Sequence, residues 1–254
     1  MNEKTRTKKK VSGRPALWVD PPLGWKFCPG CHHSIIERAI LETVDELGLG
    51  GKSIAVIGIG CGAFFVKRLN LDNIYAAHGR AADVSTAIKR VHPDCIVFTM
   101  QGDGDCFSIG AGPLMGALTR AENITVFMFN NGHFGMTGGQ MAPTTIEDHP
   151  TTTTPKGRNP SLAGYPAHVP ELIAPMKAVT YTARGAVNNP SNFQRTKGYI
   201  KTALKKQMEG DGLSFVEILS ACPTHLHMSP VDSLKWMENE MIPEFPLGEF
   251  KNID

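Results

Sequence analysis

Hydrophobic residues follow two different patterns along this chain. Between residues 34 and 47 they fall at three- and four-residue steps, which predicts an amphipathic helix that ends at the glycines just beyond it. Short continuous apolar runs predict strands that are buried on both faces of a sheet. These runs cover residues 53–59, 95–101, 124–129 and 214–219.

Further elements lie between these runs. A strand is predicted at residues 74–77, and helices at residues 81–91, 109–120 and 192–209. Strands that alternate with helices predict an α/β fold, a three-layer sandwich with a mainly parallel sheet. Residues 132–170 break this alternation with many Thr, Pro and Gly, which indicates a functional loop or an interface segment.

One domain accounts for most of the chain. The 254 residues, 41% of them hydrophobic, suffice for one sizeable core, and no repeat or linker divides them. We therefore expect a single domain over residues 28–254, preceded by an extended arm over residues 1–27. The arm is polar, and its basic residues are interpreted as part of a solvated tail. Beyond residue 230 we expect one short helix and then a proline-punctuated tail.

Charge and hydropathy exclude several classes of protein. The net charge of +2 gives no reason to expect a nucleic acid partner. No apolar stretch reaches the roughly 18 residues that a membrane helix needs. The basic N-terminal residues are not followed by the apolar segment of a secretory signal. We therefore expect a cytoplasmic protein without a membrane partner.

A glycine-rich motif follows the predicted strand at residues 95–101, where ligands bind in open parallel sheets. It reads Gly102-Asp103-Gly104-Asp105 and precedes a predicted helix. Its glycines let the backbone approach an anion, and the helix offers free N–H donors to phosphate. An aspartate there would repel phosphate unless a cation lay between them, which suggests a bridging Mg²⁺.

Two asparagines, Asn130 and Asn131, follow the next strand along the chain. They come after 25 residues beyond Gly104, a separation that can bring the two strand ends side by side. Asparagine offers a carbonyl oxygen to the same metal. A Gly-Asp-Gly motif alone is usually a turn, but the strand, the spacing and the asparagine pair together favour a Mg²⁺–diphosphate site.

This pair of motifs resembles the fingerprint of thiamine-diphosphate enzymes. The resemblance implies a thiamine-diphosphate-binding fold in which Asp103, the Asn131 side chain and the backbone carbonyl of His133 hold Mg²⁺. Asn130 would support the loop. The family also carries segments similar to Ala77-His78-Gly79-Arg80-Ala81 and to the loop at residues 134–140, although a solvated arginine and a plain glycine-rich loop remain the alternatives. The residues expected to contact the cofactor are Gly60, Cys61, His78, Arg80, Gly102, Asp103, Gly104, Asp105, Asn131, His133, Gly135, Met136 and Thr137, with Gln140 as a further polar contact.

Six cysteines in such a chain indicate metal or redox chemistry rather than disulfides. Cys28 and Cys31 alone could be a redox dithiol or half of a zinc or iron–sulfur site. Cys61 and Cys222 each follow a predicted strand, so four thiolates can meet at the rim that carries Asp103. Four thiolates suit zinc or a [4Fe–4S] cluster, and their place beside an electron-yielding cofactor favours the cluster.

The remaining cysteines and a neighbouring histidine are interpreted separately. Cys95 opens a buried strand and is expected to pack as a small hydrophobic residue. Cys106 follows the phosphate motif, where its backbone could touch the cofactor, and it is not expected to be a ligand. His32 could tune hydrogen bonding at a cluster, although an ordinary packed or surface histidine is the favoured interpretation.

The combination resembles the β subunits of 2-oxoacid:ferredoxin oxidoreductases, with Cys-Pro-Gly-Cys near the start, Gly-Ile-Gly-Cys after the first strand and a distant last cysteine. The resemblance runs from Cys28 to about residue 250; His32 departs from it, because the family has glycine there. It implies CoA-dependent oxidative decarboxylation of a 2-oxo acid, of branched-chain or 2-oxoglutarate type. Electrons would pass through a [4Fe–4S] cluster to ferredoxin, and an α subunit, with γ and δ subunits, would supply the activating glutamate and complete the enzyme.

Two other functions compete with this one. A non-oxidative thiamine-diphosphate lyase or synthase half explains the Asp103 and Asn131 motifs but gives the four cysteines no role. A zinc-stabilised, non-catalytic assembly subunit explains the cysteines but not the Mg²⁺–diphosphate motifs. Iron and sulfide analysis and a thiamine-diphosphate titration separate the three.

Overall fold

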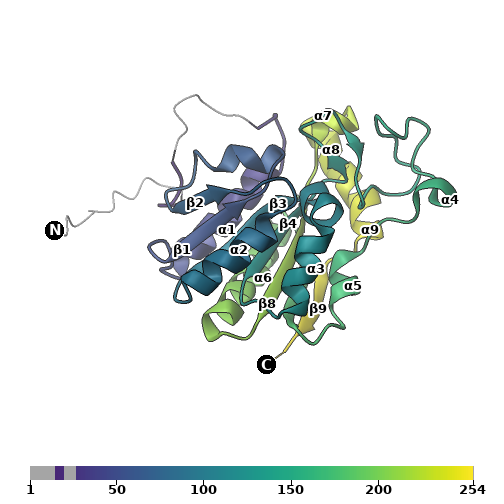
Figure 1. Ribbon diagram of the computed structural model, residues 1–254. Coiled ribbons are helices and arrows are strands. Elements are labelled where there is room, and N and C mark those ends of the chain that lie inside the picture. The colour runs from purple at the N-terminus through teal and green to yellow at the C-terminus, as the bar shows by residue number, and fades with distance from the viewer. Residues whose placement is uncertain (1–14, 20–26, 254) are drawn as a thin grey trace.

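A twisted sheet forms the centre of the computed structural model, which describes residues 15–19 and 27–253 (Figure 1). Within these residues the sheet has seven strands in the order β2-β1-β3-β4-β8-β7-β9. The first six run parallel, and β9 pairs antiparallel with β7. The strands are β1 Ser53–Ile57, β2 Asp72–Tyr75, β3 Ile96–Gly102, β4 Thr125–Asn130, β7 Val179–Ala186, β8 Leu213–Leu219 and β9 Gly248–Asn252, and a separate hairpin pairs β5 His133–Phe134 with β6 Gln140–Met141.

Helices cover both faces of the sheet (Figure 1). Helices α1 and α6 pack on one face, and α2, α3 and α5 pack on the other. The helices are α1 His33–Glu46, α2 Ala81–Val91, α3 Ala111–Thr119, α4 Pro160–Ala163, α5 Val169–Ile173, α6 Pro190–Glu209, α7 Pro223–Leu226, α8 Pro230–Trp236 and α9 Ile242–Glu244, with a 3-10 turn at Cys61–Phe65 and π-helical turns at Asp105–Ile109 and Met237–Met241.

The side chains of successive residues in each central strand point to opposite faces of the sheet. In β4, Phe127 and Phe129 belong to the core under α1 and α6, whereas Val126 and Met128 belong to the core under α2 and α3. All four are fully buried. A parallel strand between two helical layers is apolar on both faces, which explains its continuous apolar run. The expected three-layer α/β fold with a mainly parallel sheet is confirmed.

Local sequence signals set the ends of the longest helix, α6. The Asn189 side chain accepts a hydrogen bond from the N–H of Asn192, and Pro190 occupies the first turn, where its missing N–H is harmless. The helix ends at Gly210, whose φ of 83° lies in the left-handed region. These signals place the predicted helix at residues 192–209 within two residues of the observed one.

Several elements differ from the expectations, among them the short strands and helices within residues 132–170. Strand β7 was not predicted, because Thr, Arg and Gly interrupt its apolar character. The expected tail beyond residue 230 is wrong in part, since it contains α9 and the edge strand β9 as well as the short helix α8. The helix predicted at residues 109–120 is preceded by a π-helical turn at Asp105–Ile109 and begins at Ala111.

Most of the expected N-terminal arm lies outside the described residues, which begin with 15–19 and resume at 27. The basic run near the N-terminus is among the residues outside. Leu17 is buried, and Trp18 forms a β-bridge with Leu69. The Arg68 guanidinium lies 4.5 Å from the centre of the Trp18 ring. The described part of the arm therefore packs against the body of the protein.

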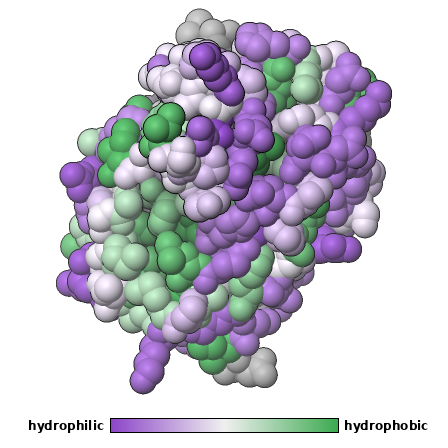
Figure 2. Space-filling model, turned by 90° about the vertical axis from the view of Figure 1, so that its right-hand side faces the viewer, coloured by the Kyte–Doolittle hydropathy of each residue, from purple (hydrophilic) through white to green (hydrophobic). Residues whose placement is uncertain are grey.

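The surface is unevenly polar. Figure 2 shows the face that carries α4 and α5, with apolar residues gathered toward the left and hydrophilic residues toward the right. Leu162, Tyr165 and Leu172 are exposed apolar residues of this region. Among the described helices, none is long and apolar enough to span a bilayer.

The strand order places a crevice at one end of the sheet. The chain runs from β1 outward to β2 and then returns to β3 on the other side of β1. At such a switch point the loops after two neighbouring strands leave in opposite directions and open a crevice beyond their carboxyl ends. The loops that follow β1, β2, β3 and β4 therefore meet at one rim.

Candidate functional site

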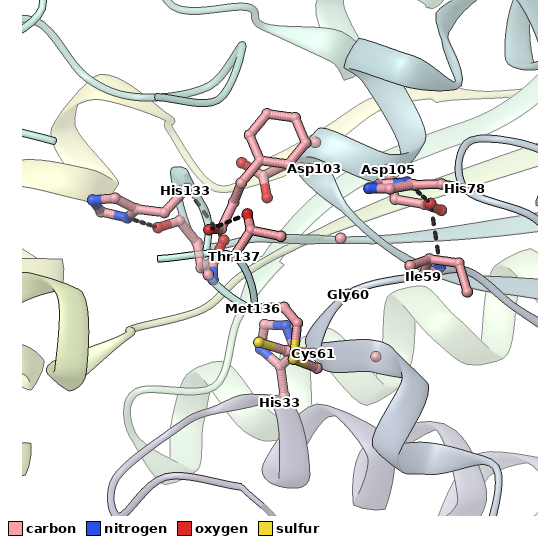
Figure 3. A pocket seen from close by; sticks show the side chains of 16 residues that line it. His33, Ile59, Gly60, Cys61, His78, Asp103, Asp105, His133, Met136 and Thr137 are labelled. Carbon is pink, nitrogen blue, oxygen red and sulfur yellow. Dashed lines mark hydrogen bonds and ion pairs between the residues drawn. The ribbon is translucent and has the colours of Figure 1, made fainter. Parts of the chain in front are cut away.

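A pocket opens at this rim, beyond the carboxyl ends of the parallel strands (Figure 3). Its lining includes every residue that the sequence predicted to contact a cofactor except Arg80 and the further polar contact Gln140. Ile59, Gly62, Phe134 and His33 also line it. Arg80 is exposed and forms an ion pair with Asp83 at 3.5 Å, as the solvated alternative supposed.

Asp103 is a buried carboxylate without a cationic partner among the residues that line the pocket. Its Oδ2 accepts a hydrogen bond of 2.5 Å from the Thr144 hydroxyl. Burial raises the pKa of Asp103 to about 7, although hydrogen bonds from Thr144 and the Gly104 N–H favour the ionised form. A nearby divalent cation would offset this burial penalty, so Asp103 fits the role of a Mg²⁺ ligand.

Asp105, two residues on, is fully occupied by the protein. Its carboxylate accepts hydrogen bonds from His78 Nδ1 at 2.5 Å and Gln101 Nε2 at 2.6 Å. It also accepts the backbone N–H of Gly79 at 2.8 Å and of Ile59 at 3.3 Å, and Figure 3 shows the His78 and Ile59 bonds. These donors follow β1 and β2 or belong to β3. Asp105 therefore holds three strand ends together, a role that the sequence did not reveal.

The two asparagines of the turn after β4, Asn130 and Asn131, have different contacts. Asn130 is buried, donates to Glu217 Oε1 at 2.6 Å and accepts the Gly132 N–H at 3.0 Å. Asn131 lines the pocket, and its Oδ1 accepts the His133 N–H at 3.3 Å. His133 Nδ1 donates to the Asn131 carbonyl at 2.8 Å. Asn130 therefore supports the turn and Asn131 lines the pocket, while the expected role of Asn131 as a Mg²⁺ ligand stays a prediction.

A buried arginine behind Asn130 was missed by the sequence analysis. Arg184 donates to Glu217 Oε2 at 2.6 Å, and its other two nitrogens donate to Glu171 at 2.6 and 2.7 Å. Burial raises the pKa of Glu217, and the Arg184 charge opposes that shift. Glu217, a charged residue inside the apolar run of β8, was the available signal, because a buried charge must be paired.

The four predicted cysteines gather beside this pocket. Burial raises the pKa of Cys31 to about 12, and charge repulsion from Cys222, Cys61 and Cys28 contributes. Burial likewise raises the pKa of Cys61 to about 11, with contributions from Cys222, Cys28 and Asp103. The thiols are therefore neighbours on the rim that carries Asp103, although they come from four separate parts of the chain. Cys31, Cys61 and Cys222 therefore resist deprotonation unless a cation is present.

Backbone contacts hold the cysteine segments together. Cys31 donates its N–H to the Cys28 carbonyl at 3.0 Å, and the His32 N–H reaches the Ala221 carbonyl at 3.4 Å. Among the described residues, no three His, Cys, Asp or Glu side chains converge closely enough to hold one metal ion. The four sulfurs are close enough that each would repel the ionised form of its neighbours.

The loop at residues 134–140 closes one side of the pocket. A Cβ added at Gly104 would lie 2.3 Å from the Phe134 ring, so glycine is required for this ring to pack there. Thr137 and Gln140 hydrogen-bond to each other, at 2.7 Å from Oγ1 to Oε1 and 2.9 Å from Nε2 to the Thr137 carbonyl. Met136 is 45% exposed and lines the pocket. The loop is thus a turn held by its own hydrogen bonds, and its contact with a cofactor stays a prediction.

The residues with open roles lie away from the pocket lining. Cys106 is buried in the core under α2 and α3, and Cys95 packs against the same core. His32 is buried, and burial lowers its pKa to about 4. These surroundings favour the packing interpretation for all three.

The fold and this site define a thiamine-diphosphate-binding domain. Residues 58–218 match the family described as thiamine pyrophosphate enzyme, C-terminal TPP binding domain. That match covers more than half of the chain and contains the Asp103 and Asn131 motifs.

Several named proteins are similar over most of this chain. The ketoisovalerate oxidoreductase subunit VorA of Methanothermobacter thermautotrophicus is 40% identical over 91% of this chain and 48% of its own length. The 2-oxoglutarate synthase subunit KorB of Archaeoglobus fulgidus is 32% identical over 84% of this chain and 75% of its own length. Subunit beta of 2-oxoacid:ferredoxin oxidoreductase 2 of Aeropyrum pernix is 34% identical over 88% of this chain and 69% of its own length.

A solved structure agrees with these relatives. It is the 2-oxoglutarate:ferredoxin oxidoreductase from Magnetococcus marinus with 2-oxoglutarate, coenzyme A and succinyl-CoA bound. The TM-score is 0.75 with 26% identity, over 97% of this chain and 87% of that chain. The chain belongs to the β subunits of the 2-oxoacid:ferredoxin oxidoreductase family. It spans about half the length of the ketoisovalerate relatives.

Proposed function

We propose that this chain carries thiamine diphosphate, Mg²⁺ and a [4Fe–4S] cluster in an enzyme that oxidises a 2-oxo acid with coenzyme A and passes the electrons to ferredoxin. The observation that carries the proposal is the meeting of the Asp103 pocket and four cysteines at one rim of the sheet. A lyase needs only the pocket, and a zinc-stabilised subunit needs only the cysteines.

The diphosphate half of the site rests on three oxygens. Asp103, the Asn131 side chain and the His133 carbonyl would hold Mg²⁺, which prefers oxygen ligands. Asn130 holds this turn in place through Glu217. The buried Asp103 carboxylate, which lacks a cation among the lining residues, supports this assignment.

The cysteine half of the site would hold the cluster through Cys28, Cys31, Cys61 and Cys222. These four thiols lie together beside the Asp103 pocket, and four thiolates are the ligand set of a [4Fe–4S] cluster. When bound, thiamine diphosphate supplies the nucleophilic carbon and the cluster accepts electrons one at a time.

A partner subunit would complete the active site. None of the described residues that line the pocket is a glutamate, whereas thiamine chemistry needs one against the pyrimidine ring. We infer that a pyrimidine-binding α subunit, together with further γ and δ subunits, supplies it. The exposed apolar residues Leu162, Tyr165 and Leu172 support a role in assembly. The purified chain alone should show no turnover, and full CoA-dependent activity of the isolated chain would contradict this inference.

We propose a branched, apolar 2-oxo acid as the substrate. The pocket presents Ile59 and Met136, and its described lining has no lysine or arginine for a second carboxylate. The ketoisovalerate relatives agree with this choice. A comparison of kcat/KM for 3-methyl-2-oxobutanoate and 2-oxoglutarate, on the co-purified complex, tests it. A higher kcat/KM for 2-oxoglutarate would contradict it.

Metal analysis of the anaerobically purified complex tests the cluster. We expect about four iron and four sulfide per chain. Cys222→Ser should lower the iron content, whereas the matched control Cys95→Ser should leave it unchanged.

Calorimetric titration with thiamine diphosphate tests the diphosphate half of the site, and it should show tight binding only with Mg²⁺ present. Zinc in place of iron, or binding that is indifferent to Mg²⁺, would refute the proposal.

A further inference from the structure

The imidazole of His225 touches the loop at residues 134–140, which we call the thiamine loop. Its Nε2 donates a hydrogen bond of 2.7 Å to the Gly135 carbonyl. A Cβ added at Gly139 would lie 2.5 Å from His225 Nδ1, so the ring packs directly on this backbone. The ring also stacks on His133 with centroids 5.9 Å apart. The His225 side chain therefore contacts both the thiamine loop and His133, which precedes that loop.

The backbone of His225 belongs to the segment that carries Cys222. We call residues 222–226 the cysteine segment. The His225 N–H donates to the Cys222 carbonyl at 3.1 Å. Burial raises the pKa of Cys222, and the nearby backbone N–H groups of His225 and Thr224 oppose that shift. His225 is thus attached to the cysteine by its backbone and to the thiamine loop by its side chain.

Gly135, the residue that His225 holds, lies between the two halves of the site. A Cβ added there would stand 3.4 Å from the Cys61 sulfur and 3.4 Å from Asn131 Nδ2. A displaced Gly135 would therefore disturb a cysteine and a proposed Mg²⁺ ligand together.

We propose that His225 is a positioning residue that fixes the thiamine loop to the cysteine segment and so sets the separation of the two cofactors. The inference rests on the proposed function. Electron transfer slows steeply as donor and acceptor move apart, and active-site geometry tolerates little displacement. One half-buried hydrogen bond at the junction therefore governs how fast electrons leave the thiamine pocket.

Three substitutions of His225 in the co-expressed complex test the proposal. His225→Gln keeps a donor that reaches the Gly135 carbonyl, His225→Asn is polar but too short, and His225→Leu has no donor. His227→Asn is the matched control, because His227 is exposed and lies two residues away, and asparagine tolerates its positive φ of 52°. Iron content and circular dichroism establish that each complex is assembled.

Two measurements follow. Amide hydrogen exchange of residues 134–140, without added thiamine diphosphate, should quicken about tenfold in the Leu and Asn variants and stay within threefold of wild type in the Gln variant and the control. Single-turnover reduction of the cluster by 2-oxo acid and CoA should slow by at least tenfold in the same two variants. Unchanged exchange and unchanged reduction in both the Leu and Asn variants would overturn the proposal, as would a Gln variant as slow as the Leu variant.

The outcome separates this inference from the proposed function. A wild-type complex whose cluster is not reduced by any 2-oxo acid would refute the proposed function. The exchange measurement would still decide whether His225 holds the thiamine loop, because it needs neither substrate nor cofactor.

Discussion

Asp103 and Asp105 lie two residues apart in one motif, and both are buried, yet their surroundings differ. Asp105 accepts four hydrogen bonds from three parts of the sheet. Asp103 accepts the Thr144 hydroxyl and backbone N–H groups, and burial still raises its pKa to about 7. One carboxylate is satisfied by the protein, and the other is arranged to be completed by a ligand.

The comparison separates two ways of using a buried charge. Asp105 contributes to stability, because its removal would leave several buried donors unpaired. Asp103 carries a burial penalty that a bound cation would remove. A functional carboxylate is therefore recognised by what its surroundings lack, and a structural one by what they supply.

Asp103→Asn should have the largest effect. The amide is isosteric but uncharged, so the affinity for thiamine diphosphate in the presence of Mg²⁺ should fall about 1,000-fold, or about 4 kcal/mol. The free energy of unfolding without cofactor should not fall, because a neutral group is easier to bury. Calorimetry and urea denaturation measure the two quantities. A loss of affinity smaller than tenfold would remove Asp103 from the metal site.

Asp105→Ala should act on stability instead. It leaves the donors of His78, Gln101 and Gly79 without their acceptor, which should lower the free energy of unfolding by about 3 kcal/mol. Urea denaturation measures the change. Asp94→Ala, at an exposed aspartate, is the control and should change stability by less than about 0.5 kcal/mol. Equal effects of the two substitutions would show that Asp105 does not join the strand ends.

Thr144→Val should have an intermediate effect on binding. It removes the hydroxyl that orients the Asp103 carboxylate, so the affinity for Mg²⁺–thiamine diphosphate should fall about fivefold, or about 1 kcal/mol. Thr144→Ser keeps the hydroxyl and should restore wild-type affinity in the same titration. A Ser variant as weak as the Val variant would assign the effect to packing rather than to the hydrogen bond.

Arg80→Ala should have the smallest effect. Arg80 is exposed and pairs with Asp83, and exposed ion pairs contribute about 0–1 kcal/mol. Thiamine-diphosphate affinity and the KM for the 2-oxo acid should change by less than about twofold, as steady-state assays and calorimetry can measure. A tenfold rise in either value would return Arg80 to the cofactor site that the family resemblance implied.

The sequence alone determined the layers of the fold and the local half of the site. Apolar runs identified the four buried strands β1, β3, β4 and β8, because a parallel strand buried on both faces is apolar throughout. The motifs at Asp103 and at Asn131 could be joined because each follows a strand, and the carboxyl ends of parallel strands share one rim. Strands β7 and β9 were not predicted, because polar residues interrupt the apolar pattern by which a strand is recognised.

The tertiary structure alone decided how each neighbouring polar residue is used. Spacing cannot tell Asp103 from Asp105, because the difference comes from donors that belong to other strands and to Thr144. The contacts of Glu217 with Asn130 and of His225 with Gly135 join positions about 90 residues apart, as the separations of 87 and 90 record. Local sequence patterns report hydrophobicity and turn preference, whereas such pairings depend on which side chains the packed sheet brings within reach of one another.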